Sequence, residues 1–132
     1  MYEVVDISSM KEYDLTNYMN LSIKLDVAII EGNTILMDSV ISIQDMKDRL
    51  TSLKRDAEIK IKENPLYKND VERKKAFDDY IKTDEEYVNL NEEIRILERE
   101  NSRVEIILSS NRRRWELVMN IINVMRDHLL IK

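Results

Sequence analysis

The residues available for catalysis in this chain are few, because it has one histidine, His128, and no cysteine. The absence of cysteine excludes disulfides, zinc–thiolate sites and cysteine nucleophiles. His128 has only Asp127 beside it as an acidic partner, and a helix end favours a histidine there without any catalytic role. Carboxylates cluster at residues 78–79 and 84–86, but adjacent side chains on a helix point apart. We therefore expect no enzymatic activity, no metal site and no cofactor.

Basic side chains are the second group of candidate functional residues, because they can bind phosphate groups. Three aromatic residues, Tyr67, Phe77 and Tyr80, are interleaved with them. Lysine and arginine can follow a phosphate backbone while aromatic faces stack on unpaired bases. Acidic residues are also interspersed, so an ordinary charged helix surface is the alternative. The candidate nucleic-acid-binding residues are Lys54, Arg55, Lys60, Lys62, Lys68, Arg73, Lys74 and Lys75.

A second basic run, residues 112–114, precedes Trp115. It is either another binding cluster or a set of partners for acidic residues of the first helix, for example Glu31 or Asp38. The distribution of charge favours the first group as the binding site. The chain has a net charge of −5, but residues 47–82 hold 11 basic and 8 acidic groups between two acidic flanks.

The composition predicts long helices. Gly and Pro occur once each in 132 residues, so the chain lacks the turn-forming residues that an α/β or all-β domain needs. At 43% hydrophobic and 36% charged residues, it is too apolar for a disordered chain. The length fits one domain. No apolar run approaches the roughly 20 residues that span a bilayer, and residues 1–9 have no signal-peptide features. We expect a cytoplasmic protein, in a host cell if a phage encodes it, without a membrane partner.

The elements follow from helix start and stop signals. Residues 1–9 are expected to form an N-terminal arm, either a strand or an ordered segment. Capping pairs of the Ser-x-x-Glu kind occur at Ser9, Asn69 and Thr83, and each is typical of a helix start. Asn64-Pro65 ends the first helix, because proline disfavours helical geometry in the residue before it. The expected ranges are helix 10–62, connection 63–69, helix 70–82 and helix 84–131.

The first long helix contains a glycine, Gly32, between two apolar runs. A β-turn between two short strands within residues 27–37 is one interpretation. A continuous helix is the other, because the helical apolar stripe stays in phase across the glycine. That stripe comprises Leu25, Ile29, Leu36, Val40, Ile43, Leu50, Leu53, Ala57 and Ile61.

The last helix carries the clearest periodicity. Apolar residues recur at alternating gaps of three and four from Tyr87 to Leu129, a heptad seam of about six repeats that is typical of coiled coils. Two seam positions are polar, Asn101 and Asn111. A buried Asn at such a position fixes the register of the pairing helices or the oligomeric state. The predicted fold class is therefore all-α, a long antiparallel helical hairpin or coiled coil with a short helix at the bend.

Further apolar residues lie outside these seams in both long helices. A two-helix hairpin buries one stripe per helix, so the remainder must meet something else, and other copies of the chain are the simplest candidate. The expected homo-oligomer interface comprises Ile23, Val27, Ile30, Met37, Ile41, Ile107, Leu117, Ile121 and Val124.

The stretch from Asn64 to Met125 resembles small helical recombination-accessory proteins of tailed phages, of the UvsY type. The resemblance rests on Asn64-Pro65, the basic residues 73–75, the acidic helix start at residues 84–87 and the leucine- and isoleucine-rich helix that ends in Arg-Arg-Arg-Trp at 112–115. It covers about half of the chain. It implies an oligomer that binds single-stranded DNA and helps to load a RecA-like recombinase. The acidic net charge and the first helix depart from that pattern.

Three functions are compatible with the sequence. The leading hypothesis is an oligomeric, non-enzymatic accessory protein of DNA recombination. The first alternative is a phage or mobile-element protein that inhibits a host defence protein or nuclease by surface contact. The second alternative is a structural coiled-coil adaptor. Salt-sensitive binding of single-stranded DNA would favour the first hypothesis.

Overall fold

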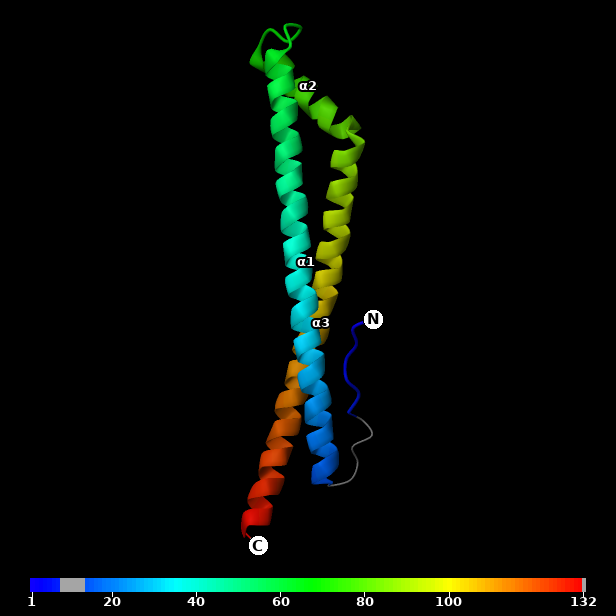
Figure 1. Cartoon of the computed structure of the whole chain (residues 1–132), viewed down its shortest axis with the longest axis vertical. Coiled ribbons are helices and arrows are strands. Elements are labelled where there is room, and N and C mark those ends of the chain that lie inside the picture. The colour runs from blue at the N-terminus through cyan, green and yellow to red at the C-terminus, as the bar shows by residue number, and fades with distance from the viewer. Residues whose placement is uncertain (8–13, 132) are drawn as a thin grey trace. The chain divides into compact units, whose positions relative to one another are not determined.

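The computed structural model describes residues 1–7 and 14–131, with side chains described as far as His128. These residues form three helices, α1 (Leu15–Glu63), α2 (Asp70–Thr83) and α3 (Glu85–Ile131), and no strand (Figure 1). The all-α prediction is therefore confirmed. The chain divides into two units. The first comprises residues 1–38 and 101–132, and the second comprises residues 39–100.

Helix α1 begins where the side chain of Asp14 caps it. The backbone N–H of Thr16 donates to Asp14 Oδ1 at 2.9 Å, which satisfies a donor that has no partner within the helix. The predicted start at Met10, with its capping pair at Ser9, lies outside the described residues, but Asp14 of the predicted range is not helical and α1 begins at Leu15. The helix continues through Gly32 without a positive φ. Of the two interpretations of residues 27–37, the continuous helix is therefore the correct one.

The predicted cap of α2 at Asn69 is confirmed. The Glu72 backbone N–H donates to Asn69 Oδ1 at 2.9 Å. The Glu72 carboxylate accepts from the Lys68 backbone N–H at 2.9 Å instead of from Asn69. Both parts of a capping box are therefore present. The glutamate side chain, however, accepts from the residue before the cap and not from the cap residue itself.

Replacing Asn69 with alanine is expected to lower the free energy of unfolding by about 1 kcal/mol, because the Glu72 N–H loses its acceptor. Urea denaturation followed by circular dichroism measures this. Asn91, a half-buried asparagine inside α3, supplies the control substitution to alanine, which removes no cap. Equal losses for the two variants would contradict a capping role.

The predicted cap of α3 at Thr83 is wrong, because Asp84 performs that function. Asp84 Oδ1 accepts from the backbone N–H of Glu86 at 3.0 Å. The Thr83 hydroxyl instead donates back to the carbonyls of Asp79 and Tyr80, both at 3.1 Å, within α2. Asp84 has an extended backbone, with φ −74° and ψ 109°, so α2 and α3 are separate helices.

The heptad seam of α3 is the buried side of that helix. Each seam residue from Tyr87 to Met125 is buried or half-buried. In the first unit, Val118 and Ile122 of the seam form a core with Tyr18, Leu21 and Leu25 of α1. Trp115, also on the seam, packs against this core. Within this unit, α1 and α3 therefore lie side by side through apolar contacts.

The N-terminal arm completes the first unit through the buried residue Asn111. The Val5 N–H donates to Asn111 Oδ1 at 2.8 Å, and Asn111 Nδ2 donates to Tyr2 Oη at 3.1 Å and to the Glu3 carbonyl at 3.2 Å. Tyr2 Oη in turn donates to the carbonyl of Ala28 in α1 at 2.8 Å. The hydrogen bonds of this seam asparagine therefore go to the arm of its own chain.

Gly32 leaves the space that the ring of Tyr2 occupies. A Cβ at this position would lie 2.6 Å from Tyr2 Oη and 2.9 Å from Leu108 Cδ1, both closer than real contacts allow. The glycine is therefore explained by close packing, since the helix itself needs no special backbone angle there.

The second unit pairs α1 with α3 through a smaller apolar core and surface ion pairs. Its buried apolar residues are Ile43, Ala57, Ile61 and Ile94. Lys47 pairs with Glu98 at 3.3 Å and Arg49 with Glu86 at 2.8 Å. The hydrogen bond from Arg49 to Glu86, followed by the charge of that carboxylate, raises the pKa of the Arg49 guanidinium. Such half-exposed pairs contribute little to stability, because solvent screens the two charges.

One residue of the predicted α1 stripe is exposed, whereas the others are buried or half-buried. Val40 is 60% exposed, whereas the neighbouring Ser39 is half-buried and Ile43 is buried. The contact face of α1 therefore passes through residue 39 at this point. Because the helical period is about 3.6 residues, the positions three and four after Leu36 both lie near its face, and spacing alone does not distinguish them.

Candidate nucleic-acid interface and assembly surfaces

The α1–α2 connection brings part of the predicted basic set together within the second unit. Lys62 of α1 and Arg73 and Lys74 of α2 line a cavity of about 320 Å³, together with Phe77. Arg73 also pairs with Asp70 at 3.0 Å, so part of its charge is already compensated. The lysines are exposed and form no ion pair with a described residue.

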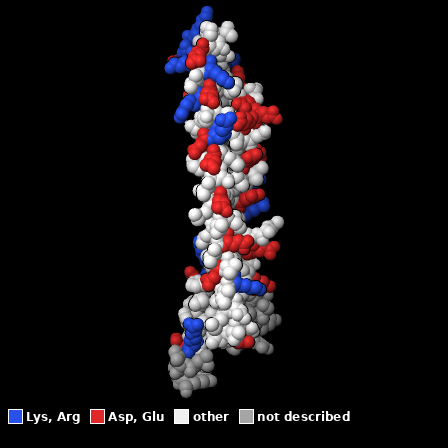
Figure 2. Space-filling model, viewed as in Figure 1, with Lys and Arg blue, Asp and Glu red and all other residues white. Residues whose placement is uncertain are grey.

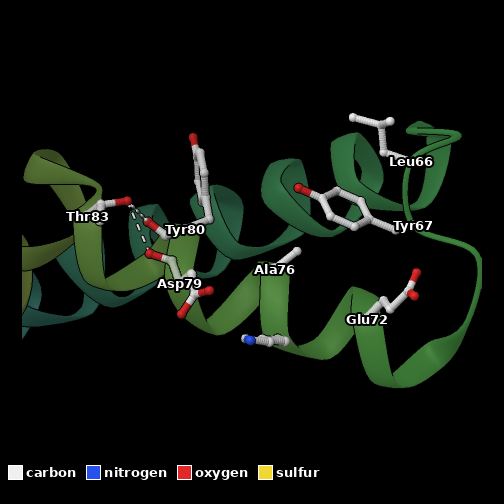
Figure 3. Close-up of a pocket in the computed structure, with 8 residues that line it drawn as sticks. Leu66, Tyr67, Glu72, Ala76, Asp79, Tyr80 and Thr83 are labelled. Atoms are coloured by element: carbon white, nitrogen blue, oxygen red, sulfur yellow. Dashed lines mark hydrogen bonds between the residues drawn. The ribbon is translucent and has the colours of Figure 1, made fainter.

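A second cavity, of about 620 Å³, lies between the connection and α2 (Figure 3). Tyr67 from the connection and Tyr80 from α2 lie on the same side of α2, with the small side chain of Ala76 between them. Lys75 also lines this cavity, and so do the acidic residues Glu72 and Asp79. The two rings offer apolar faces beside a cation, which is the combination that binds an unpaired base and its phosphate.

Three other predicted residues have exposed side chains that form no ion pair with a described residue. They are Arg55, Lys60 and Lys68. Lys54 is placed differently, because its Nζ lies 5.8 Å from the centre of the Tyr87 ring of α3, a cation–π contact within the second unit. Of the eight predicted residues, the structure therefore gathers Lys62, Arg73, Lys74 and Lys75 most closely.

Sequence reasoning missed Lys82. It lines a hollow along α2 with Lys74, Lys75 and Val71, although Asp78 and Asp79 border the same hollow. Its helical spacing from Lys75 and Asp78 could have identified it, since residues seven and four apart share a helix face. On the face shown in Figure 2, Lys and Arg side chains gather over the α1–α2 connection, with Asp and Glu among them.

The second basic run, residues 112–114, is turned toward neighbours in the first unit. Arg112 Nη2 donates to Asn33 Oδ1 of α1 at 2.8 Å. Arg114 Nη1 donates to the Ser110 hydroxyl of its own helix. The predicted contact with α1 is therefore present, but its partner is Asn33 and neither Glu31 nor Asp38. Arg113 is exposed.

The predicted assembly residues of α1 are exposed. In the first unit, Ile23, Val27, Ile30 and Met37 expose 59–67% of their surface. Ile41, in the second unit, is 58% exposed. The four residues of the first unit share one helix face, which we call the α1 outer stripe. A monomeric soluble protein rarely exposes a contiguous apolar patch of this kind.

The predicted assembly residues of α3 divide into two groups. Leu117 and Val124 are exposed, and so is Ile106. Ile107 is half-buried, and Ile121 packs against the core of the first unit. The assignment of Ile121 to an assembly surface is therefore corrected: it lies three residues after Val118 and four before Met125, which places it at the edge of the buried seam. Asn101 is half-buried on the seam, and its role in register stays a prediction.

No group of three or more His, Cys, Asp or Glu side chains suited to a metal ion occurs in the described part of the chain. None of the described helices is both long and apolar enough to cross a membrane. The surfaces that remain as candidates for function are the lysine- and tyrosine-bearing end of the second unit and the outer faces of the first unit. No known protein family, curated protein or solved structure matches the chain.

Proposed function

We propose that this protein is a non-enzymatic accessory factor of DNA recombination that binds single-stranded DNA and acts as an assembly of several copies. The proposal takes the chain as the antiparallel helical hairpin that the sequence predicts. Contacts inside each unit support that pairing, since Asn33 contacts Arg112 in the first unit and Lys47 contacts Glu98 in the second. A RecA-like recombinase is the protein partner that the resemblance implies.

The observation that carries the DNA-binding part is the group of exposed lysines beside two tyrosines. Lys62, Lys74 and Lys75 lack an ion-pair partner among the described residues, and Lys75 shares a cavity with Tyr67 and Tyr80. A lysine that forms no ion pair keeps its ammonium group available to a phosphate, although carboxylates line the same cavities. The tyrosine faces favour a single strand over a duplex, because bases in a duplex are already stacked on one another.

Acidic residues in the same region set a limit on affinity. Glu72 and Asp79 line the tyrosine cavity, so a single copy offers only a weakly positive surface. Linking several weak sites raises the overall affinity by orders of magnitude, because each further contact becomes intramolecular. DNA binding and self-association are for this reason parts of one proposal.

The test is the salt dependence of binding to a labelled oligonucleotide that lacks secondary structure. Each lysine–phosphate contact on a single strand contributes about −0.7 to the slope of log affinity against log salt. The variant in which Lys62, Lys74 and Lys75 are all alanine is therefore expected to bind more weakly, with a slope that is flatter by roughly 2. Fluorescence anisotropy at three or more salt concentrations measures both quantities.

The matched control replaces Arg95, Arg99 and Arg126 with alanine, three exposed residues of α3. This variant loses the same formal charge but is expected to keep the wild-type slope. Equal slopes for the lysine variant and the wild type would refute the assignment of the site. If the wild type binds no oligonucleotide but associates with one host protein, the inhibitor function replaces this proposal. Absence of both interactions would favour the adaptor function.

A further inference from the structure

The first unit has two apolar outer faces on opposite sides. Residues on the α1 outer stripe lie two positions from buried or half-buried residues, as Ile23 does from Leu21 and Leu25. Two positions on an α-helix correspond to a rotation of about 200°, so the stripe faces away from the core. On α3 the same offset relates Ile106 to Leu108 and Val124 to Ile122. Because α1 and α3 share the core, their outer faces point in opposite directions.

The exposed row on α3, which we call the α3 outer row, comprises Ile106, Arg113, Leu117 and Val124. It differs from the α1 outer stripe in charge. Acidic residues border the α1 stripe. Asp26 lies three positions after Ile23, Glu31 lies four after Val27, and Asp38 is next to Met37. All three are exposed. Arg113 lies within the α3 row itself, and Arg103 precedes Ile106 by one helical turn.

These charges disfavour contact between identical faces. Two α1 stripes placed together would bring six carboxylates close to one another, and the nearby Lys24 supplies one cation per chain. Two α3 rows placed together would bring the Arg113 side chains of both copies close to one another, without the excess of acidic groups that borders the α1 stripe. An α1 stripe against an α3 row brings acidic groups toward Arg103 and Arg113, although Glu105, Glu116 and Asp127 also border the α3 row. Like-charge contacts cost free energy, whereas complementary ones fix the orientation of partners.

The shape of the α3 surface favours the same pairing. A hollow of about 420 Å³ lies beside Ile106 and Arg113, and it is lined also by Ser102, Glu105 and Ser109. The two serines are small, so the hollow can accept a large apolar side chain from a facing helix, in the manner of coiled-coil packing. The α1 outer stripe carries such side chains in Ile30 and Met37, which are 65% and 67% exposed.

We infer that the α1 outer stripe of one copy binds the α3 outer row of a second copy. This inference rests on the self-association in the proposed function and specifies its geometry. The two surfaces in the contact are different, so an open assembly keeps one free stripe at one end and one free row at the other. Such a head-to-tail interface produces a ring if the rotation closes and a filament if it does not. Either assembly would repeat the lysine-bearing end once per copy.

The test mixes two full-length variants, Ile30→Glu and Leu117→Glu. Each variant keeps one intact face and loses the other, so each alone is expected to be a monomer where the wild type is assembled. The mixture is expected to form a one-to-one heterodimer of twice the 15.8 kDa chain, through the α1 stripe of the Leu117 variant and the α3 row of the Ile30 variant. The heterodimer cannot grow, because both remaining faces carry glutamate. Native mass spectrometry and multi-angle light scattering measure these masses.

The control is Val88→Glu, at an exposed apolar position of α3 in the second unit, which is expected to leave the assembly intact. Circular dichroism verifies that all variants remain helical. Association of the Leu117 variant with itself would show an α1–α1 interface and overturn the inference. So would self-association of the Ile30 variant, or a mixture that remains monomeric. A monomeric wild type at micromolar concentration would also remove self-association from the proposed function, whereas the oligonucleotide titration tests DNA binding separately.

Discussion

Replacing Asn111 with alanine is expected to destabilise the first unit by about 3 kcal/mol and to release the N-terminal arm. The carboxamide takes part in three hydrogen bonds with the arm, to Val5, Tyr2 and Glu3, and each is worth about 1 kcal/mol. Asn111 is fully buried, so the shortened side chain also leaves a space in the packing. The arm then keeps only the hydrogen bond from Tyr2 to Ala28 and the packing of Val5 and Ile7, so we expect it to separate from α1 and α3 far more often.

Trp115 reports this change, because it is the single tryptophan of the chain and it packs against the core of the first unit. Urea unfolding followed by its fluorescence gives the loss of stability, and hydrogen exchange at residues 2–7 gives the release of the arm. Asn123→Ala, at an exposed asparagine of the same helix, is the matched control and is expected to change stability by less than about 0.5 kcal/mol. Unchanged protection of Val5 in the Asn111 variant would refute the role of this residue as the anchor of the arm.

The main features of the fold follow from simple properties of the sequence. The scarcity of glycine and proline predicts helices, and the heptad spacing predicts which side of α3 is buried, from Tyr87 to Met125. Periodicity identifies a face because side chains three and four positions apart lie together. It does not identify what covers that face. Asn111 is on the seam as expected, yet its partner is the arm, which is more than one hundred residues away in sequence.

Gly32 shows a second limit of sequence reasoning. From the sequence, a glycine between two apolar runs is compatible with a turn or with a helix that tolerates it. The structure explains its presence by the ring of Tyr2, whose hydroxyl would lie 2.6 Å from any added Cβ. A contact between an irregular arm and a helix has no periodicity, so no spacing rule could have revealed it.

The candidate DNA-binding site could be predicted only in part, because spacing in the sequence does not show which basic side chains are already paired. Basic residues near Pro65 are visible in the sequence, but their orientation depends on the angle between α1 and α2. Lys54 lies over the Tyr87 ring, and Arg73 pairs with Asp70, so these two are less available to phosphate than Lys74 or Lys75. The assembly surface is also predicted only in part. Ile121 packs on the core, whereas Ile106, which the prediction omitted, is exposed.

The contrast between the two faces of α1 leads to the second prediction, which concerns Leu25 and Val27. Leu25 is fully buried in the core of the first unit, whereas Val27 is 59% exposed on the α1 outer stripe. Leu25→Ala is expected to lower the free energy of unfolding by roughly 2–5 kcal/mol, because it removes buried methyl groups and leaves a cavity. Val27→Ala changes a side chain that lies mostly outside the intrachain packing, and alanine is a better helix former than valine.

The two variants are therefore expected to differ in how their stability depends on protein concentration. Binding between copies stabilises the folded state by mass action, so an assembled protein gains stability as its concentration rises. Leu25→Ala should lose the same amount of stability at every concentration, because the lost contacts lie within one chain. Val27→Ala should have the same free energy of unfolding as the wild type in dilute solution. It should be less stable than the wild type only at concentrations at which the wild type assembles. Urea unfolding of all three proteins over a hundredfold range of concentration, followed by Trp115 fluorescence, distinguishes the two patterns. If the stability of Val27→Ala and that of the wild type change equally with concentration throughout that range, the α1 outer stripe takes no part in assembly.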